Sequence, residues 1–141
     1  AYEIPKRDWS SDVCSSDLPE RAAALDAYAH RLRALVGRIR RFGAEPVLVT
    51  QPTAEYRIRD GWIWVGTAKD GGPDAWSYDW IGVFNRTTLE VCRELKGICL
   101  DLAATVEFDD TDFYDRLHTT PAGAAKIGRY LFDQLRDRLT P

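Results

Sequence analysis

The 141-residue sequence has few of the residues from which disulfide scaffolds and metal sites are built. It has three cysteines, which cannot all pair with one another, and none stands in a Cys-x-x-Cys arrangement, so a disulfide framework or a zinc knuckle is not expected. Cys92 and Cys99 lie on apolar faces and are expected to be inert core thiols. No apolar run approaches the roughly 20 residues that cross a bilayer, so we expect no membrane span. A net charge of -3 leaves no basic stripe, so no nucleic acid is expected as a partner.

What the chain does have is the composition of a folded domain. Hydrophobic residues make up 45% of it, charged residues 29% and aromatic residues 11%. These values are typical of a globular protein rather than a disordered or fibrous one, and the length suits one domain. The sequence alone specifies neither the cellular compartment nor the oligomeric state.

Serine is scarce and unevenly placed. Four of the five serines lie between Arg7 and Leu18, in the stretch R-D-W-S-S-D-V-C-S-S-D-L. Its repeat of S-S-D at a spacing of five fits neither the period of a helix nor that of a strand. The stretch resembles the translation of a DNA sequencing adapter, so we interpret residues 1–18 as an artefactual or disordered N-terminal segment, with a polar surface linker as the alternative. We expect the rest, residues 19–141, to begin within a gene.

Three helices are expected from apolar residues that recur at three- and four-residue steps. The first follows Pro19 and stops at Gly43, the second runs from about Trp80 to Lys96 with Gly97 as its stop, and the third begins at Pro121. Proline suits a first helical turn and glycine suits a helix end. The side chains expected to face inward are Leu25, Tyr28, Leu32, Leu35, Val36 and Ile39 in the first helix, Ile81, Phe84, Val91, Cys92 and Leu95 in the second, and Ile127, Leu131 and Leu135 in the third.

Two short apolar runs, residues 46–51 and 98–102, each follow a helix and are expected to form buried parallel strands. Between them, Asp60 and Gly61 separate residues 56–59 from residues 62–65, and a two-residue Asp-Gly turn favours a β-hairpin. The alternation of helices and strands is typical of an α/β fold with helices on the faces of a parallel sheet.

One loop after the second strand brings an acid and a histidine together. Asp115 and His118 lie three residues apart in the run F-Y-D-R-L-H-T-T-P-A-G, residues 113–123. A carboxylate bound to one nitrogen of an imidazole fixes the tautomer and leaves the other nitrogen free to act as a general base. The spacing alone is weak evidence, because a surface histidine beside an acidic loop has the same pattern.

The residues around this pair resemble the last block of the SGNH (GDSL-type) hydrolases. The resemblance extends to residues 38–52 and 85–102, and it covers roughly residues 20–139. In that family the aspartate and histidine of this block complete a Ser-His-Asp triad. The resemblance therefore implies a three-layer α/β/α domain of flavodoxin-like type and a serine esterase acting on a small-molecule or carbohydrate ester. It further implies Asp115 and His118 as catalytic residues and no cofactor.

The family's nucleophile and oxyanion hole have no counterpart in the chain. The G-D-S block and the G-x-N-D block are both missing from the sequence. Ser77, the one serine outside the adapter-like stretch, stands in no nucleophile block, and Asn85, the one asparagine, lies within a predicted helix. We therefore expect residues 19–141 to be the C-terminal part of such a domain, without the N-terminal strands of its sheet, and inactive as given.

Two further features suggest other functions. Asp109, Asp110 and Asp112 precede the pair, but the glycine and glutamate of an EF-hand loop are missing, so we expect no metal. A non-catalytic α/β binding module is the alternative to an esterase, because the segment between the strands is rich in aromatic residues that form either a ligand-binding wall or a packing cluster. These residues are Tyr56, Trp62, Trp64, Trp76, Tyr78 and Trp80.

Overall fold

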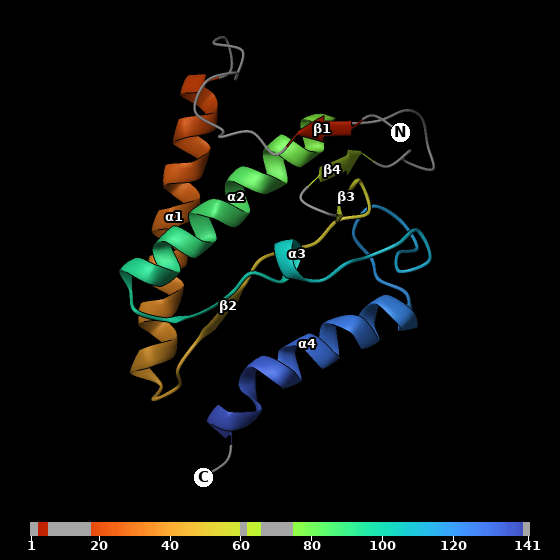
Figure 1. The fold of residues 1–141 in the computed structure, drawn as a ribbon. Helices are drawn as coiled ribbons and strands as arrows, with labels where there is room; N and C mark the ends of the chain where they lie inside the picture. Colours follow the sequence, from red (N-terminus) through yellow and green to blue (C-terminus); the bar gives the residue numbers. More distant parts are fainter. Residues whose placement is uncertain (1–2, 6–17, 60–61, 66–74, 140–141) are drawn as a thin grey trace. The chain divides into compact units, whose positions relative to one another are not determined.

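The computed structural model describes residues 3–5, 18–59, 62–65 and 75–139. Its elements in chain order are β1 (Glu3–Pro5), α1 (Leu18–Arg41), β2 (Val47–Val49), β3 (Tyr56–Arg59), β4 (Trp62–Val65), α2 (Ala75–Glu94), β5 (Ile98–Leu100), α3 (Leu102–Thr105) and α4 (Pro121–Leu139) (Figure 1). They divide into two compact units, one within residues 7–50 and 80–100 and the other within residues 1–6, 51–79 and 101–141.

The unit within residues 7–50 and 80–100 contains a parallel pair of strands. β2 pairs with β5, so that Val47 lies opposite Ile98 and Val49 lies opposite Leu100. The Thr50 amide continues the pairing by donating to the Leu100 carbonyl at 3.0 Å. The predicted parallel pairing of the two apolar runs is confirmed, and the chain is broadly an α/β protein.

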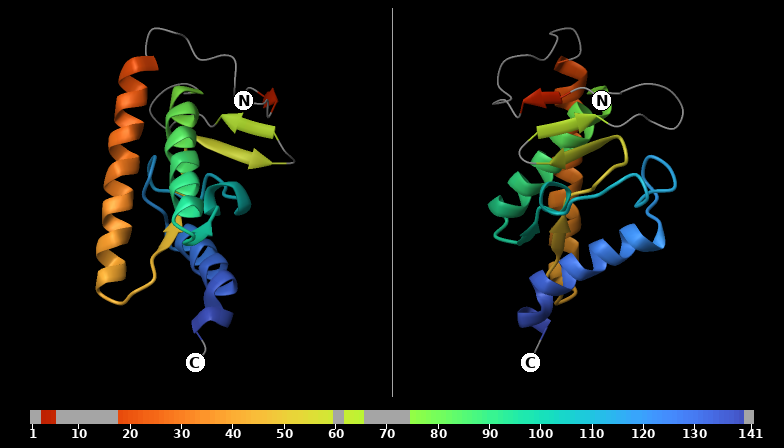
Figure 2. Two further views of the ribbon diagram at one scale, coloured as in Figure 1. Left: turned by 90° about the vertical axis from the view of Figure 1, so that its left-hand side faces the viewer. Right: turned by 45° about the vertical axis from the view of Figure 1, so that its right-hand side comes forward.

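Helices α1 and α2 lie side by side in this unit (Figure 2). The Tyr28 hydroxyl is 2.7 Å from Oγ1 of Thr88, and the Tyr28 ring meets the Phe84 ring edge-on at 4.9 Å between centroids. One turn and a half further along, the Arg33 guanidinium binds the Glu94 carboxylate at 2.6 Å. Of these residues, Tyr28 and Phe84 belong to the apolar faces that the sequence predicts for the two helices.

The core of this unit is a small cluster at the end of α1. Its buried members are Val36, Leu48 and Cys92, and the half-buried side chains of Leu32, Leu95 and Cys99 pack against them. The prediction that Leu35 faces inward is wrong, because its side chain is 53% exposed. Leu35 and Val36 are neighbours in sequence and therefore point about 100° apart around the helix, so the contact surface buries only one of them.

Cys92 and Cys99 are joined by a disulfide, with 5.8 Å between their Cα atoms, which corrects the expectation of two free thiols. The chain reverses between them at the end of α2, where the Gly97 amide donates to the Cys92 carbonyl at 2.9 Å. The left-handed residue of this turn is Lys96, at φ 52°, and not the predicted stop Gly97. A Cβ on Gly97 would lie 3.3 Å from Sγ of Cys92, so glycine here leaves room for the cross-link. At the end of α1, the predicted stop Gly43 takes the left-handed conformation, at φ 79°.

The other unit contains the predicted β-hairpin. β3 and β4 pair antiparallel, with Tyr56 opposite Val65 and Arg59 opposite Trp62. The predicted turn, residues 60–61, lies outside the described residues. β1 pairs antiparallel with β4 and adds a third strand that the sequence pattern does not predict (Figure 2). Residues 6–17, most of the adapter-like stretch, also lie outside the described part of the chain, so the interpretation of residues 1–18 stays a prediction.

Helix α2 begins at Ala75, earlier than the predicted start near Trp80. Apart from Ala75, the residues of the run A-W-S-Y-D are aromatic or small polar ones of modest helix propensity, so the run resembles a connecting segment. Their place directly before a strongly amphipathic stretch lets the helix extend backward through them, because each added residue contributes one more backbone hydrogen bond.

Helix α4 begins at Pro121 as predicted. Oγ1 of Thr120 accepts a hydrogen bond from the Gly123 amide at 3.3 Å and so caps the helix. The inward-facing prediction holds in part, because Ile127, Leu131 and Leu135 are half-buried. Among the described helices, none has the length and apolar character needed to span a membrane.

Candidate functional site

Asp115 and His118 form a hydrogen-bonded pair, as the sequence predicts. Oδ2 of Asp115 lies 2.7 Å from Nδ1 of His118. The other carboxylate oxygen accepts the backbone amides of Leu117 and His118, each at 2.8 Å. These backbone hydrogen bonds, with the imidazole contact added, hold the pKa of the Asp115 carboxyl well below its ordinary range. Asp115 is therefore a carboxylate whose three acceptor contacts all belong to the turn that carries His118.

The imidazole of His118 is open to solvent, with its side chain 79% exposed. Because Nδ1 faces the carboxylate, a neutral ring keeps its proton on Nδ1 and leaves Nε2 as the acceptor. The part of the chain that the structure describes offers no hydrogen-bond partner to Nε2. The arrangement is that of a general base held in one tautomer.

Backbone hydrogen bonds close the loop that carries the pair. The Thr120 amide donates to the Asp112 carbonyl at 2.9 Å, and the Tyr114 amide donates to the His118 carbonyl at 2.8 Å. Between these two contacts, Phe113 and Thr119 form an antiparallel bridge. Residues 112–120 are therefore a short hairpin-like loop with the pair at its tip.

A segment that follows β2 holds the tip of this loop at Arg116. The Ala54 amide and the Thr53 hydroxyl both donate to the Arg116 carbonyl, at 2.9 Å and 3.0 Å. The buried Glu55 carboxylate binds Nη1 of Arg116 at 3.2 Å. Because Arg116 stands between Asp115 and His118 in sequence, these contacts fix the turn that positions both side chains.

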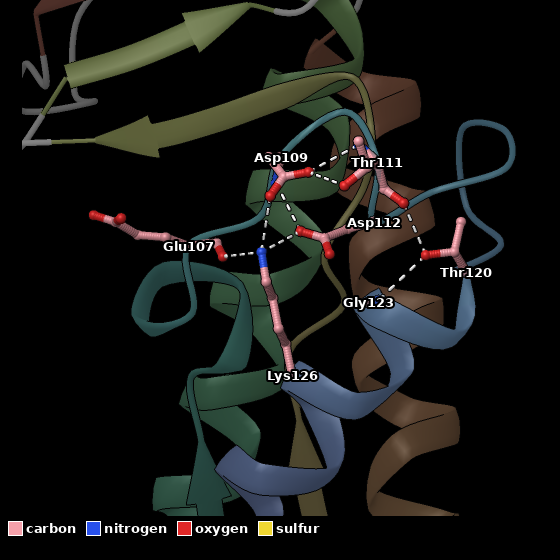
Figure 3. A network of polar contacts seen from close by, with 7 residues as sticks. All are labelled: Glu107, Asp109, Thr111, Asp112, Thr120, Gly123 and Lys126. Carbon is pink, nitrogen blue, oxygen red and sulfur yellow. Dashed lines mark hydrogen bonds and ion pairs between the residues drawn. The ribbon is translucent and has the colours of Figure 1, made fainter.

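An ion pair between the half-buried Lys126 and a buried carboxylate holds the base of the same loop (Figure 3). Nζ of Lys126, on the second turn of α4, lies 2.5 Å from Oδ2 of Asp112, whose side chain is 1% exposed. The same ammonium reaches Oδ2 of Asp109 at 3.1 Å and the Glu107 carbonyl at 3.4 Å. The hydrogen bond to Asp112 is the largest cause of a raised pKa of the Lys126 ammonium. The Asp109 carboxyl has a lowered pKa, chiefly because it accepts hydrogen bonds from the Thr111 hydroxyl and amide.

The start of α4 packs directly on the backbone of Asp112. A Cβ placed on Gly123 would lie closer to the Asp112 carbonyl oxygen than any non-bonded contact allows. Thr120 adds a second link, because its hydroxyl donates to the Thr111 carbonyl at 2.8 Å (Figure 3). Gly123 is therefore needed for its lack of a side chain, since it takes no left-handed backbone conformation.

Sequence reasoning also singles out a serine, an asparagine, a second histidine and six aromatic residues, and the structure describes some of them. Ser77 lies in α2 by its backbone, but its side chain is outside the described part of the chain, as are those of the other serines. Asn85 lies within α2 and His30 is exposed on α1. Trp80 packs edge-on against Phe84 at 5.3 Å between centroids, which is a packing contact. The side chains of the other five aromatic residues lie outside the described part, so the alternative of an aromatic ligand wall stays a prediction.

The acidic residues before the pair form hydrogen bonds with the protein itself. Among the described residues, no group of three or more His, Cys, Asp or Glu side chains is arranged to hold a metal ion. The cation beside Asp109 and Asp112 is the Lys126 ammonium, a residue that sequence reasoning missed. No local signal marks it, because a lysine on an amphipathic helix is usually solvated.

The resemblance of residues 113–123 and of two upstream segments to SGNH hydrolases stays a prediction from the sequence. Comparison of the chain with protein-family models, with curated proteins and with solved structures finds no match.

Proposed function

We propose that this chain carries the acid–base pair of a serine ester hydrolase of SGNH type, within a three-layer α/β/α domain. The observation that supports the proposal most is the 2.7 Å contact between Oδ2 of Asp115 and Nδ1 of an exposed His118. The substrate class we propose is a small-molecule or carbohydrate ester. The serine nucleophile and the oxyanion donors come, in this proposal, from a segment outside the 141 residues.

In the proposed reaction His118 acts through Nε2. It takes the proton of the serine hydroxyl as that oxygen attacks the ester carbonyl, and it then gives the proton to the departing alcohol. The same nitrogen activates the water that releases the acid from the acyl-enzyme. Asp115 keeps the ring in the required tautomer and stabilises the imidazolium that forms in each half of the reaction.

The test begins with the source DNA upstream of codon 20. Where an in-frame segment with a G-D-S block precedes residue 19, that segment is expressed joined to residues 19–141, and hydrolysis of short-chain aryl esters is measured. His118→Ala is expected to reduce kcat by about 10²–10⁴-fold, the usual contribution of a positioned general base. His30→Ala is the matched control, because it removes an exposed histidine of α1 and is expected to leave kcat unchanged.

The 141-residue chain alone tests the proposal that the serine nucleophile lies outside it. It is expected to hydrolyse aryl esters no faster than its His118→Ala variant, since general-base help without a nucleophile gives little rate. Turnover that Ser77→Ala abolishes would show that the nucleophile lies within this chain. The proposal would be contradicted if the upstream segment has no serine block and the joined protein binds esters without hydrolysing them.

A further inference from the structure

We infer that Lys126 is a positioning residue, which sets the Asp115–His118 pair in place through the buried carboxylate of Asp112. The inference rests on the proposed function, because positioning matters only if the pair acts on a substrate. It adds to that proposal a residue on α4, eight positions beyond the histidine and in contact with neither member of the pair.

The carboxylate of Asp112 is buried, and only one of its two oxygens has a partner among the described residues. Its side chain is 1% exposed, and Oδ1 has no hydrogen-bond partner among the described residues. Oδ2 carries all of the compensation, from Nζ of Lys126 at 2.5 Å and from the Asp109 amide at 2.7 Å. A buried carboxylate is costly unless it is paired, so Lys126 supplies the only formal positive charge that balances it in this network (Figure 3).

The backbone of Asp112 lies at the base of the loop. Its carbonyl accepts the Thr120 amide, which closes the base of the loop, and its backbone lies against Gly123. The neighbouring Phe113 is buried, packs on Phe108 at 5.3 Å between ring centroids and bridges to Thr119. The carboxylate of Asp112 therefore cannot turn toward water without disturbing the backbone contacts that close the loop.

The base of the loop is connected to the Asp115–His118 pair through the backbone of Tyr114. The Tyr114 amide donates to the His118 carbonyl directly above the Phe113–Thr119 bridge, so opening of the base loosens the residue that carries the imidazole. Without the Lys126 charge, the buried Asp112 carboxylate has no cation to balance it in this network, which favours conformations that bring it to solvent. The loss of the ion pair therefore reaches His118 through the closing hydrogen bonds at Asp112 and Tyr114.

The test uses amide hydrogen exchange and NMR of the 141-residue chain. In Lys126→Met, the Thr120 and Tyr114 amides are expected to exchange about 10- to 100-fold faster, the range set by leaving a buried acceptor uncompensated. The Nδ1 proton signal of His118 is expected to broaden or vanish. Arg129→Met, an exposed charge removal one turn further along α4, is the matched control and is expected to change neither reading.

Restoration by a second substitution separates positioning from a general role in helix stability. In the double variant Asp112→Asn with Lys126→Met the buried charge is gone, and exchange at Thr120 and Tyr114 is expected to return to within about threefold of the original chain. If Lys126→Met alone does not fold, the comparison of the double variant with the original chain still tests the inference.

Exchange in Lys126→Met that equals that of the original chain would overturn the inference, as would a double variant no better ordered than the single one. None of these readings uses ester hydrolysis. Failure of the proposed function would appear as missing turnover with the exchange results intact, and failure of this inference would leave the effect of His118→Ala on turnover unchanged.

Discussion

The contact between Gly123 and the Asp112 carbonyl gives the sharpest test of the structure around the candidate site. The change is Gly123→Ala, which adds one methyl group in the first turn of α4. Helix propensity alone would make this change stabilising by up to about 1 kcal/mol. The structure predicts the opposite sign, because the new carbon would clash with the Asp112 carbonyl oxygen and would lie 3.1 Å from the Asp112 carbonyl carbon.

The expected change in the free energy of unfolding follows from the displacement of the loop backbone that the new methyl group requires. Normal contact requires the loop backbone to withdraw from the helix by roughly 1 Å or more. Overpacking of this kind costs about 1–3 kcal/mol, and loss of the hydrogen bond from the Thr120 amide to Asp112 costs about 1 kcal/mol. After the propensity gain is subtracted, we expect Gly123→Ala to lower the free energy of unfolding by about 2 kcal/mol.

The assay is urea denaturation followed by far-ultraviolet circular dichroism, with Gly128→Ala as the matched control. Gly128 lies on the same helix, and a Cβ there meets nothing within 4 Å, so its replacement is expected to raise stability by up to about 1 kcal/mol. Opposite signs for the two variants are the predicted result. If Gly123→Ala stabilises the chain as Gly128→Ala does, the close packing of α4 on the loop is refuted.

Two further predictions concern charge and cross-linking. Hydrogen bonds lower the pKa of the Asp115 carboxyl in the folded state. Their contribution to the free energy of unfolding is therefore fully present above the ordinary carboxyl pKa of about 3.9, and it is lost as the pH falls through the lowered value. A carbon-13 NMR titration of Asp115 with an ordinary midpoint would contradict this prediction. Reduction of the disulfide between Cys92 and Cys99 is expected to lower the free energy of unfolding by about 2–3 kcal/mol, since it frees a short closed loop. Urea denaturation curves recorded with and without reductant measure this loss of stability. The control is the double variant Cys92→Ser/Cys99→Ser. If reductant lowers the stability of this variant by the same amount, the disulfide is not the cause.

The elements that the sequence predicts best are those whose signals are local. The hairpin of β3 and β4 follows from an Asp-Gly turn between two short β-branched and aromatic runs, and the start of α4 follows from Thr120 and Pro121. The contact of Asp115 with His118 is local in the same way, because three residues of a turn are enough to bring carboxylate and imidazole together. Each of these predictions needed no knowledge of residues elsewhere in the chain.

The features that escaped prediction depend on residues far apart in sequence. Strand β1 has three residues and no turn signal, and it exists only because β4, some sixty residues later, offers an edge to pair with. The buried Glu55 has the ordinary appearance of a surface acid until its contact with Arg116 is seen. Lys126 and Asp112 likewise become a pair only when α4 packs on the loop.

The distribution of buried charge bears on whether the Asp115–His118 turn is a site or an ordinary surface turn. A D-x-x-H turn forms its own hydrogen bonds, so the 2.7 Å contact alone does not separate the two interpretations. An ordinary surface turn has no need of the two buried carboxylates found around this loop, Glu55 at its tip and Asp112 at its base. Burying each one costs free energy unless a cation pairs with it, and here each is paired within the loop or the helix that follows. Replacement of buried ion pairs by hydrophobic residues of similar volume is often neutral or stabilising in proteins, so these paired charges support the proposal that the loop places His118 for a reaction.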